Sequence, residues 1–279
     1  MTTTISRPSS PSKTSLALGK VWQAIFPPAL FIGVVLTVWQ LLCLSEDSAL
    51  PGPIKVIAQT IDPYLINPFF DNGGTDKGLG WQILISLQRV LMGYALAAIV
   101  GVAVGAVVGG VPFVRKGLDP IIQVLRTVPP LAWMPLALLF FQNNDRAAIY
   151  VIFITAVWPI IINTALGVQQ IPSDYKNVAR VLQLSLPEYV MNILVPATVP
   201  YVFSGLRIGI GLSWLAIVAA EMLKADGGIG FFIWDAYNAG NDNSTSQIIL
   251  AIVVVGLVGL LLDKIVAWVG RLVAPGEQR

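Results

Sequence analysis

The sequence is dominated by long apolar blocks that recur at regular intervals. Six of them approach or exceed 20 residues, at about 25–44, 86–111, 119–141, 147–168, 199–223 and 247–270. A helix of about 20 apolar residues crosses the hydrocarbon core of a bilayer. Only 11% of the residues are charged and 56% are hydrophobic, so lipid must serve as the solvent for much of this surface. The blocks predict an all-α integral membrane protein with about six transmembrane helices.

The cations in the loops predict how the chain crosses the plasma (inner) membrane, because cytoplasmic loops carry an excess of lysine and arginine. With the N-terminus inside, the inner segments hold Arg7, Lys13, Lys20, Arg115, Lys116, Lys176, Arg180, Lys264, Arg271 and Arg279. The outer segments hold only Lys55, Lys77, Arg146 and Lys224. We therefore expect a cytoplasmic tail over 1–24, a transmembrane domain over 25–270 and a cytoplasmic C-terminal tail over 271–279.

Several kinds of chemistry are excluded by composition. The chain has no histidine and a single cysteine, Cys43, so it lacks the residues of a His-based catalytic triad or a usual zinc site. It contains no G-x-x-x-x-G-K-[ST] string to hold ATP, and a net charge of +2 with no basic run does not favour nucleic acid. We expect no catalysis, no metal and no cofactor bound by this chain.

Two spans contain unusual backbone signals. Gly101, Gly105 and Gly109 lie on one face of the second span, where small residues let another helix approach closely. The third span contains Thr127-Val-Pro-Pro-Leu-Ala-Trp-Met-Pro135. Its prolines predict a bent or broken helix, and freed carbonyls in lipid must face protein or a watery cavity. This segment could line a pathway or only shape the packing.

Charged residues within or near the spans are a second candidate for function. Arg89, Arg126, Arg207 and Glu221 lie there, and such charges are costly and rarely face lipid. One interpretation is that the arginines lie near helix ends and reach the membrane surface. The alternative hypothesis is that some of them raise the potential of an anion pathway.

The inner loop 169–198 predicts a short amphipathic helix at about 173–187. Ser173 is a candidate N-cap, and Pro187 limits the length of the helix. Val178, Val181, Leu182 and Leu186 form an apolar face. Such a helix can lie on a membrane or enter a groove of a partner protein, and periodicity does not separate the two.

This loop resembles that of the permease subunits of ABC importers, which reads E-A-A, three residues, G, nine residues, I-x-L-P. Here Asn177-Val178-Ala179 precede Gln183 by the same spacing, and Ile193-Leu-Val-Pro196 follows. The residues depart from the pattern at Asn177, Val178, Gln183 and Val195, which leaves open any ion pair that the family's Glu would form.

Other segments are similar to the branch of this family that imports nitrate, sulfonates, taurine and bicarbonate. They are Leu50-Pro-Gly-Pro53, Ser86-Leu-Gln-Arg-Val-Leu-Met-Gly93, Val128-Pro-Pro-Leu-Ala-Trp133 and Glu221 before Gly227-Gly-Ile-Gly230. The stretches 200–223 and 234–240 look like cyanobacterial nitrate and bicarbonate permeases. The resemblance covers about residues 25–275.

The resemblance implies a type I ABC importer permease (MetI-like) fold that works as a dimer, with the translocation path at the interface. Two cytoplasmic ATPase subunits, which carry ATP and magnesium, would dock on the inner loop, and a periplasmic or lipid-anchored binding protein would deliver the substrate. The residues that it assigns to ATPase coupling are Asn177, Val178, Ala179, Arg180, Gln183, Pro187 and Pro196. Candidate path residues are Arg126, Thr127, Trp133, Asn163, Arg207, Trp214 and Glu221.

We favour nitrate (with nitrite) as the transported anion, with bicarbonate, a sulfonate or taurine as alternatives. A secondary, ion-coupled transporter is the alternative from another class, but such proteins normally show inverted repeats and membrane-buried carboxylates or proton relays. The sequence shows no convincing repeat and no histidine.

Overall fold

The computed structural model describes residues 13–44, 50–224 and 226–273. The chain divides into two compact units, 1–59 and 60–279, and each is described by itself. Secondary structure over these described ranges is almost entirely helical, with one isolated antiparallel bridge between Asp71 and Lys77. Five helices are long and apolar enough to cross a membrane, and a bent helix pair raises the number to six. The prediction of an all-α fold with about six spans is confirmed.

The first unit is built on one long helix. α1 (Lys13–Leu42) continues through Pro27 and Pro28, and its apolar span covers Ile25–Leu42. It begins within the segment that the sequence predicts as a tail, because good helix formers such as Leu, Ala and Lys extend upstream of the apolar block. Residues 1–12 of that tail lie outside the described residues. The Gln40 side chain then accepts a hydrogen bond from the Ile54 N–H at 3.2 Å, where α2 (Pro53–Thr60) begins.

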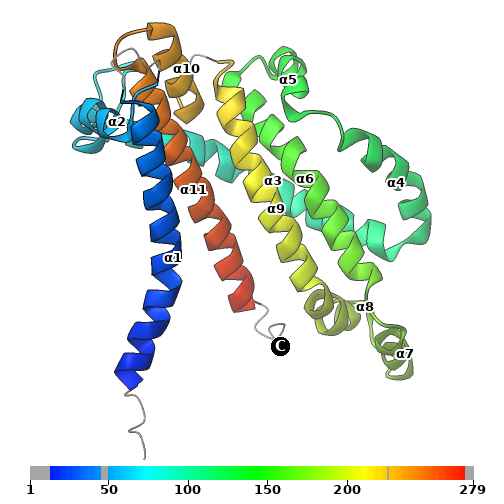
Figure 1. Cartoon of the computed structure of the whole chain (residues 1–279). Helices are drawn as coiled ribbons and strands as arrows, with labels where there is room; N and C mark the ends of the chain where they lie inside the picture. Colours follow the sequence, from blue (N-terminus) through cyan, green and yellow to red (C-terminus); the bar gives the residue numbers. More distant parts are fainter. Residues whose placement is uncertain (1–12, 45–49, 225, 274–279) are drawn as a thin grey trace, which may run out of the picture. The chain divides into compact units, whose positions relative to one another are not determined.

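The second unit is a helical bundle, coloured from cyan to red in Figure 1. Its elements are η1 (Ile61–Leu65), α3 (Leu79–Gly110), α4 (Pro112–Leu125), η2 (Pro130–Trp133), α5 (Met134–Phe141), α6 (Asn144–Gln169), α7 (Ser173–Val181), α8 (Leu186–Tyr189), η3 (Val190–Leu194), α9 (Val195–Glu221), α10 (Ile229–Ala239) and α11 (Ser244–Val273). α7 and α8 lie at one end of the bundle, and α10 lies at the other (Figure 1).

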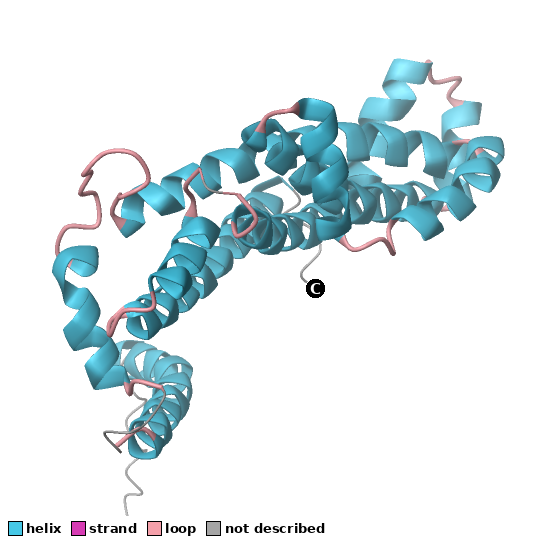
Figure 2. Cartoon of the chain, turned by 90° about the horizontal axis from the view of Figure 1, so that it is seen from above, coloured by secondary structure: helices cyan, strands magenta, loops and turns pink. Residues whose placement is uncertain are grey.

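α6 packs along both α3 and α9, and the three helices are labelled close together in Figure 1. Figure 2, which is coloured by secondary structure, shows helices joined by loops. The glycines of α3 make the α3–α6 contact close. A Cβ atom at Gly101 would lie 2.7 Å from the Ile160 side chain, and one at Gly105 would lie 2.7 Å from the Ile161 carbonyl oxygen. A Cβ atom at Gly109 would meet the carbonyl oxygen of Ala165 at 2.6 Å. The two helix backbones can approach this closely only because α3 has no side chains on that strip.

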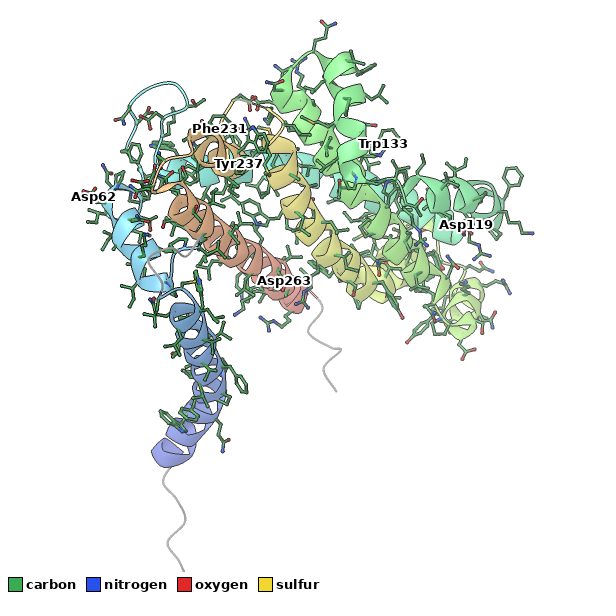
Figure 3. All side chains as sticks on the ribbon, turned by 45° about the horizontal axis from the view of Figure 1, so that its top comes forward. Asp62, Asp119, Trp133, Phe231, Tyr237 and Asp263 are labelled. Atoms are coloured by element: carbon green, nitrogen blue, oxygen red, sulfur yellow. The ribbon has the colours of Figure 1, made fainter. Side chains whose placement is uncertain are left out.

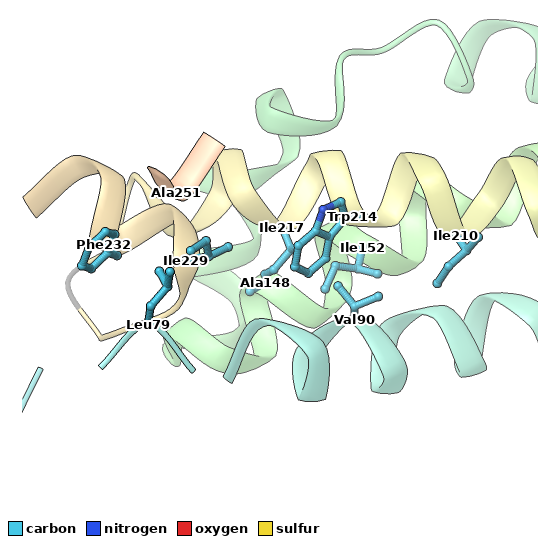
Figure 4. Packing of buried hydrophobic residues seen from close by; sticks show 10 residues of the cluster. All are labelled: Leu79, Val90, Ala148, Ile152, Ile210, Trp214, Ile217, Ile229, Phe232 and Ala251. Carbon is cyan, nitrogen blue, oxygen red and sulfur yellow. The ribbon is translucent and has the colours of Figure 1, made fainter. Parts of the chain in front are cut away.

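A core of aliphatic and aromatic side chains joins α3, α6 and α9 to α10 and α11. Figure 4 shows ten of these residues, with Trp214 of α9 among Val90, Ile152 and Ile217. The Trp214 ring is 3% exposed, and its Nε1–H donates to the Val255 carbonyl oxygen of α11 at 2.9 Å. Since its one polar atom has a partner, the ring can be buried without an unpaired donor.

The third apolar block is broken, as its prolines predict. α4 and the segment Pro130–Phe141 meet at a bend of 94°. Pro129 and Pro130 have no N–H, so the helical hydrogen bonds to the carbonyl groups of residues 125 and 126 cannot form. At the far end, Gln142 takes a left-handed conformation with φ of 48°, and Asn143 caps α6 by accepting from the Arg146 N–H at 2.9 Å.

Candidate functional site

The loop between α6 and α9 contains two short helices, α7 and α8. The sequence predicts one helix over about 173–187, and the structure corrects this to Ser173–Val181 and Leu186–Tyr189. The physical reason is Gln183, which has a φ of 47° in the left-handed region. The Leu184 N–H donates to the Ala179 carbonyl at 3.0 Å, and the Gln183 N–H donates to the Arg180 carbonyl at 3.2 Å. These two bonds form a Schellman C-cap, which ends α7.

α7 presents apolar side chains that nothing in its own unit covers. Val178 and Val181 of α7 are exposed, Val181 to 81%, as are Leu182 just after α7 and Leu186 at the start of α8. Ala179 is buried, whereas the other residues predicted for ATPase coupling are exposed: Asn177, Val178, Arg180, Gln183, Pro187 and Pro196. Lys176 and Arg180 line a hollow of about 410 Å³ with Ala179, Leu184, Leu186 and Tyr189. The loop therefore offers an apolar surface flanked by cations.

A second candidate site is a cavity of about 320 Å³ beside the broken span. Its walls come from the break, from α6 and from α9, and they include Arg126, Val128, Pro130, Ile154, Thr155, Trp158, Pro159, Ile162 and Leu212. The α6 residues lie near the middle of that 26-residue helix. The cavity is thus far from both ends of α6, at the depth where a path through the membrane has to be lined.

Three other predicted path residues lie outside the lining of this cavity. The Thr127 side chain donates to the Val124 carbonyl at 2.7 Å, and the Trp133 ring packs edge-on against Tyr150, with centroids 6.4 Å apart. Trp133 is labelled in Figure 3. The Asn163 side chain donates to the Pro159 carbonyl at 2.8 Å within α6. Thr127 and Trp133 still belong to the broken segment, and Asn163 is half-buried beside Gly205 of α9.

Arg207 and Trp214 on α9 face different surroundings. The Arg207 guanidinium donates to both carboxylate oxygens of Asp263 on α11, from Nε at 2.5 Å and from Nη2 at 2.7 Å. Figure 3 marks Asp263 on α11. Trp214 lies inside the core described above and not in the cavity wall, to which α9 contributes Leu212. The charge of Arg207 is therefore neutralised, and the Trp214 ring fills space between helices.

A buried ion network lies where α3, α6 and the end of α9 meet. Arg89 of α3 is its centre: Nη1 lies 2.7 Å from the Glu221 carboxylate, Nη2 lies 2.7 Å from Asp145, and Nη2 lies 3.3 Å from Asp226. Lys224 adds a second cation, 2.9 Å from Asp226. Two cations and three carboxylates thus share one network, which has a formal excess of one negative charge. Glu221, a predicted path residue, is 0% exposed within this network.

The network also orders the glycine-rich turn between α9 and α10. The Ser86 hydroxyl donates to Glu221 at 2.7 Å and accepts from the Ile229 N–H at 2.9 Å. The Gln82 side chain accepts from the Gly228 N–H at 2.7 Å. The sequence identified the segment that begins at Ser86 and the segment that ends at Gly230. It did not identify their partners, which are Gln82, Asp145, Lys224 and Asp226. Polar residues in the first turns of an otherwise apolar span were the available signal.

These parts together define a class of protein. Long apolar spans, a span broken beside a cavity at mid-depth and an uncovered amphipathic helix at one end of the bundle are the features of a membrane transport protein. Residues 93–275 match the family model described as binding-protein-dependent transport system inner membrane component. The chain belongs to this family: it is a multi-pass permease subunit and not an enzyme.

Similar proteins place the chain more closely within the family. It is 63% identical to the nitrate import permease protein NrtB of Synechococcus elongatus, over 99% of each chain. It is 51% identical to the bicarbonate transport system permease protein CmpB of Synechocystis, over 99% of this chain and all of that one. The expected nitrate and bicarbonate branch is confirmed.

Solved structures show the same fold. A chain in an inward-facing structure of the MetNI methionine ABC transporter superposes with a TM-score of 0.57, over 70% of this chain and 97% of that one, at 17% identity. The helical architecture is thus that of a MetI-like type I permease.

Proposed function

We propose that this chain is the membrane subunit of an ATP-driven importer of nitrate. The observation that carries the proposal is the 63% identity, over nearly the whole of both chains, with a nitrate import permease. Bicarbonate is the second candidate, because a bicarbonate permease is 51% identical over a comparable length. Nitrate and bicarbonate are both planar anions with three oxygens and one negative charge, so the higher identity, and not the shape of the path, favours nitrate.

The energy for transport comes from partner subunits in this proposal. Moving an anion inward against a negative interior costs about 2.3 kcal/mol per 100 mV. The sequence contains no P-loop string. Two cytoplasmic ATPase subunits, with their ATP and magnesium, supply the energy and bind the apolar surface of α7. Its exposed Val181, with the cations Lys176 and Arg180 nearby, suits a groove that is apolar and carries acidic residues.

The remaining partners follow from the same arrangement. Two copies of the chain form the translocation path between them, because a closed two-fold pair is the commonest symmetric assembly. Both termini and α7 lie in the cytoplasm, on the side that the excess of loop cations predicts. A periplasmic or lipid-anchored binding protein delivers the anion to the opposite face, where α10 and the α9–α10 turn lie.

Uptake by the complete complex tests the proposal. The chain is expressed with its binding protein and ATPase subunits in cells that lack their own nitrate and bicarbonate importers, and uptake of labelled nitrate and labelled bicarbonate is compared. We expect ATP-dependent nitrate uptake that excess unlabelled nitrite reduces and excess sulfonate does not. Bicarbonate uptake without nitrate uptake would select the second candidate, and uptake without any ATPase subunit would overturn the whole assignment.

A further inference from the structure

Three arginines were considered above as candidates for an anion pathway, and two of them have carboxylate partners. Arg89 is surrounded by Glu221, Asp145 and Asp226, with its closest contacts at 2.7 Å. Arg207 forms a two-point ion pair with Asp263. A guanidinium that already binds a carboxylate adds little positive potential to its surroundings. Neither arginine is therefore available to attract a transported anion.

Arg126 differs from both. It is exposed at the C-terminal end of α4, where the chain turns through 94°, and it is one of the residues that line the cavity. Among the residues that the structure describes, no carboxylate oxygen lies within 4.0 Å of its guanidinium. An uncompensated cation at this depth is costly unless water or a ligand solvates it. The positive charge of Arg126 thus acts on whatever occupies the cavity.

Most of the residues that line the cavity are apolar, but the backbone around it supplies polar groups for water or a ligand. Pro159 has no N–H for the carbonyl of Thr155, and Pro130 has none for the carbonyl of Arg126. Carbonyl groups freed in this way persist within a membrane only where they face protein or water. The Thr155 hydroxyl donates to the Val151 carbonyl at 2.6 Å and keeps lone pairs for solvent. At about 320 Å³ the cavity has room for a small anion and several waters.

We propose that Arg126 is the residue that attracts and orients a planar, monovalent oxyanion in the cavity between the broken span and α6. The planar guanidinium donates two parallel hydrogen bonds, and these match two oxygens of such an anion. Trp158 and Leu212 form apolar walls that keep the site small. This inference rests on the proposed function, because it assumes that an anion crosses here, and it adds the residue that contacts the anion.

The first test uses the purified complex in proteoliposomes, with binding protein outside and ATP inside. Arg126→Gln removes the charge, whereas Arg126→Lys keeps the charge but loses the two parallel N–H donors of the guanidinium. The control, Lys116→Gln, removes an exposed cation of α4 that does not line the cavity. We expect at least a tenfold loss of nitrate uptake for Arg126→Gln, which corresponds to a free-energy change of about 1.4 kcal/mol or more. We expect a smaller loss for Arg126→Lys, and uptake close to that of the unchanged chain for Lys116→Gln.

The outcomes separate the inference from the proposed function. If the unchanged complex takes up no nitrate, the proposed function fails. If it does take up nitrate and Arg126→Gln matches Lys116→Gln, the function stands and the inference is overturned.

A second measurement covers the case in which Arg126→Gln does not assemble. Cys43 is the single cysteine of this chain, so Arg126→Cys in a Cys43→Ser background gives the permease one thiol per copy. We expect a water-soluble cationic thiol reagent to restore uptake and a neutral reagent of similar size to leave it low. Equal effects of the two reagents, or no reaction of the thiol with either, would overturn the inference.

Discussion

Arg89 of α3 and Glu221 of α9 form a buried ion pair, with Nη1 2.7 Å from Oε1 and the carboxylate fully buried. The other carboxylate oxygen accepts from the Ser86 hydroxyl at 2.7 Å and from the Gly230 N–H at 3.1 Å. Glu221 thereby joins α3, the end of α9 and the start of α10. Through Asp145, which also contacts Arg89, the same network includes the start of α6. Four helices are tied together at one end of the bundle.

Replacing Glu221 by Ala should strongly destabilise the permease. Removing one partner of a buried ion pair typically costs about 3–5 kcal/mol, because the other charge remains buried. Asp145 and Asp226 stay beside Arg89, so we expect a loss near the lower end, about 3 kcal/mol. The measurement is the unfolding free energy of the detergent-solubilised subunit, followed by tryptophan fluorescence during denaturant titration.

Two further variants make this result specific. Asp71→Asn breaks an exposed ion pair with Lys77 in the loop before α3 and should cause a far smaller change. Arg89→Met combined with Glu221→Met removes both buried charges and should be less destabilising than Glu221→Ala alone. If the loss of unfolding free energy in the double variant equalled the sum of the losses in Arg89→Met and Glu221→Met, the two residues would not act as a pair.

Gly105→Ala tests the close contact between α3 and α6. The added Cβ would lie 2.7 Å from the Ile161 carbonyl oxygen, so the helices have to separate. We expect a loss of about 1–3 kcal/mol, as for overpacking in other cores. Gly256→Ala in α11 is the matched control, because a Cβ there meets nothing within 4 Å and alanine has the higher helix propensity. Equal stabilities of the two variants, measured by thermal aggregation in detergent, would contradict the close approach.

Apolar periodicity and glycine spacing were enough to predict the spans, a close helix contact at the glycines of α3 and the break at the prolines, because each depends on local sequence. The environment of Trp214 was not predictable in this way. Its path assignment came from its place in a span, whereas the structure buries its ring against α11, about 40 residues further along the chain. Which face of a span points inward depends on helix partners, and a uniformly apolar helix does not reveal them.

Charges were predictable as intramembrane residues but not as pairs. Arg89 and Glu221 are 132 residues apart, and Arg207 and Asp263 are 56 apart. Nothing in their local sequence says that the two arginines are neutralised and that Arg126 has no such partner among the described residues. Assigning the three arginines to different roles therefore required the folded arrangement.

Gln183→Gly should stabilise the end of α7. Gln183 has a φ of 47° in the Schellman cap, and an L-residue in this region costs about 1–2 kcal/mol, which glycine avoids. We expect a gain of about 0.5–1 kcal/mol for Gly, and a loss for Gln183→Val, because a branched side chain fits this conformation poorly. Hydrogen exchange of the α7 amides measures both. Faster exchange in Gln183→Gly than in the unchanged chain would contradict the expectation.

The left-handed conformation of Gln183 also explains why this position departs from the pattern of the related loops. The related loops carry Gly at this spacing, and the position here needs a left-handed residue that Gly adopts without strain. The cap survives the change to Gln because its two backbone hydrogen bonds are still made, at 3.0 and 3.2 Å.

Val181→Asp should uncouple the permease from its ATPase subunits without unfolding it. The Val181 side chain is 81% exposed, so a carboxylate there loses no contact within the subunit, but an apolar groove of a partner would have to desolvate the new charge. We expect loss of copurification with the ATPase subunits, and loss of ATP-dependent uptake by at least tenfold, since a desolvated unpaired charge costs well over 1.4 kcal/mol. Ile66→Asp is the matched control, because Ile66 is 70% exposed and lies in the loop before α3, outside the loop that carries α7. The control should keep its ATPase subunits. If the Val181→Asp variant also kept its ATPase subunits and showed normal uptake, the exposed apolar face of α7 would have to bind something other than the ATPase subunits, such as the membrane surface.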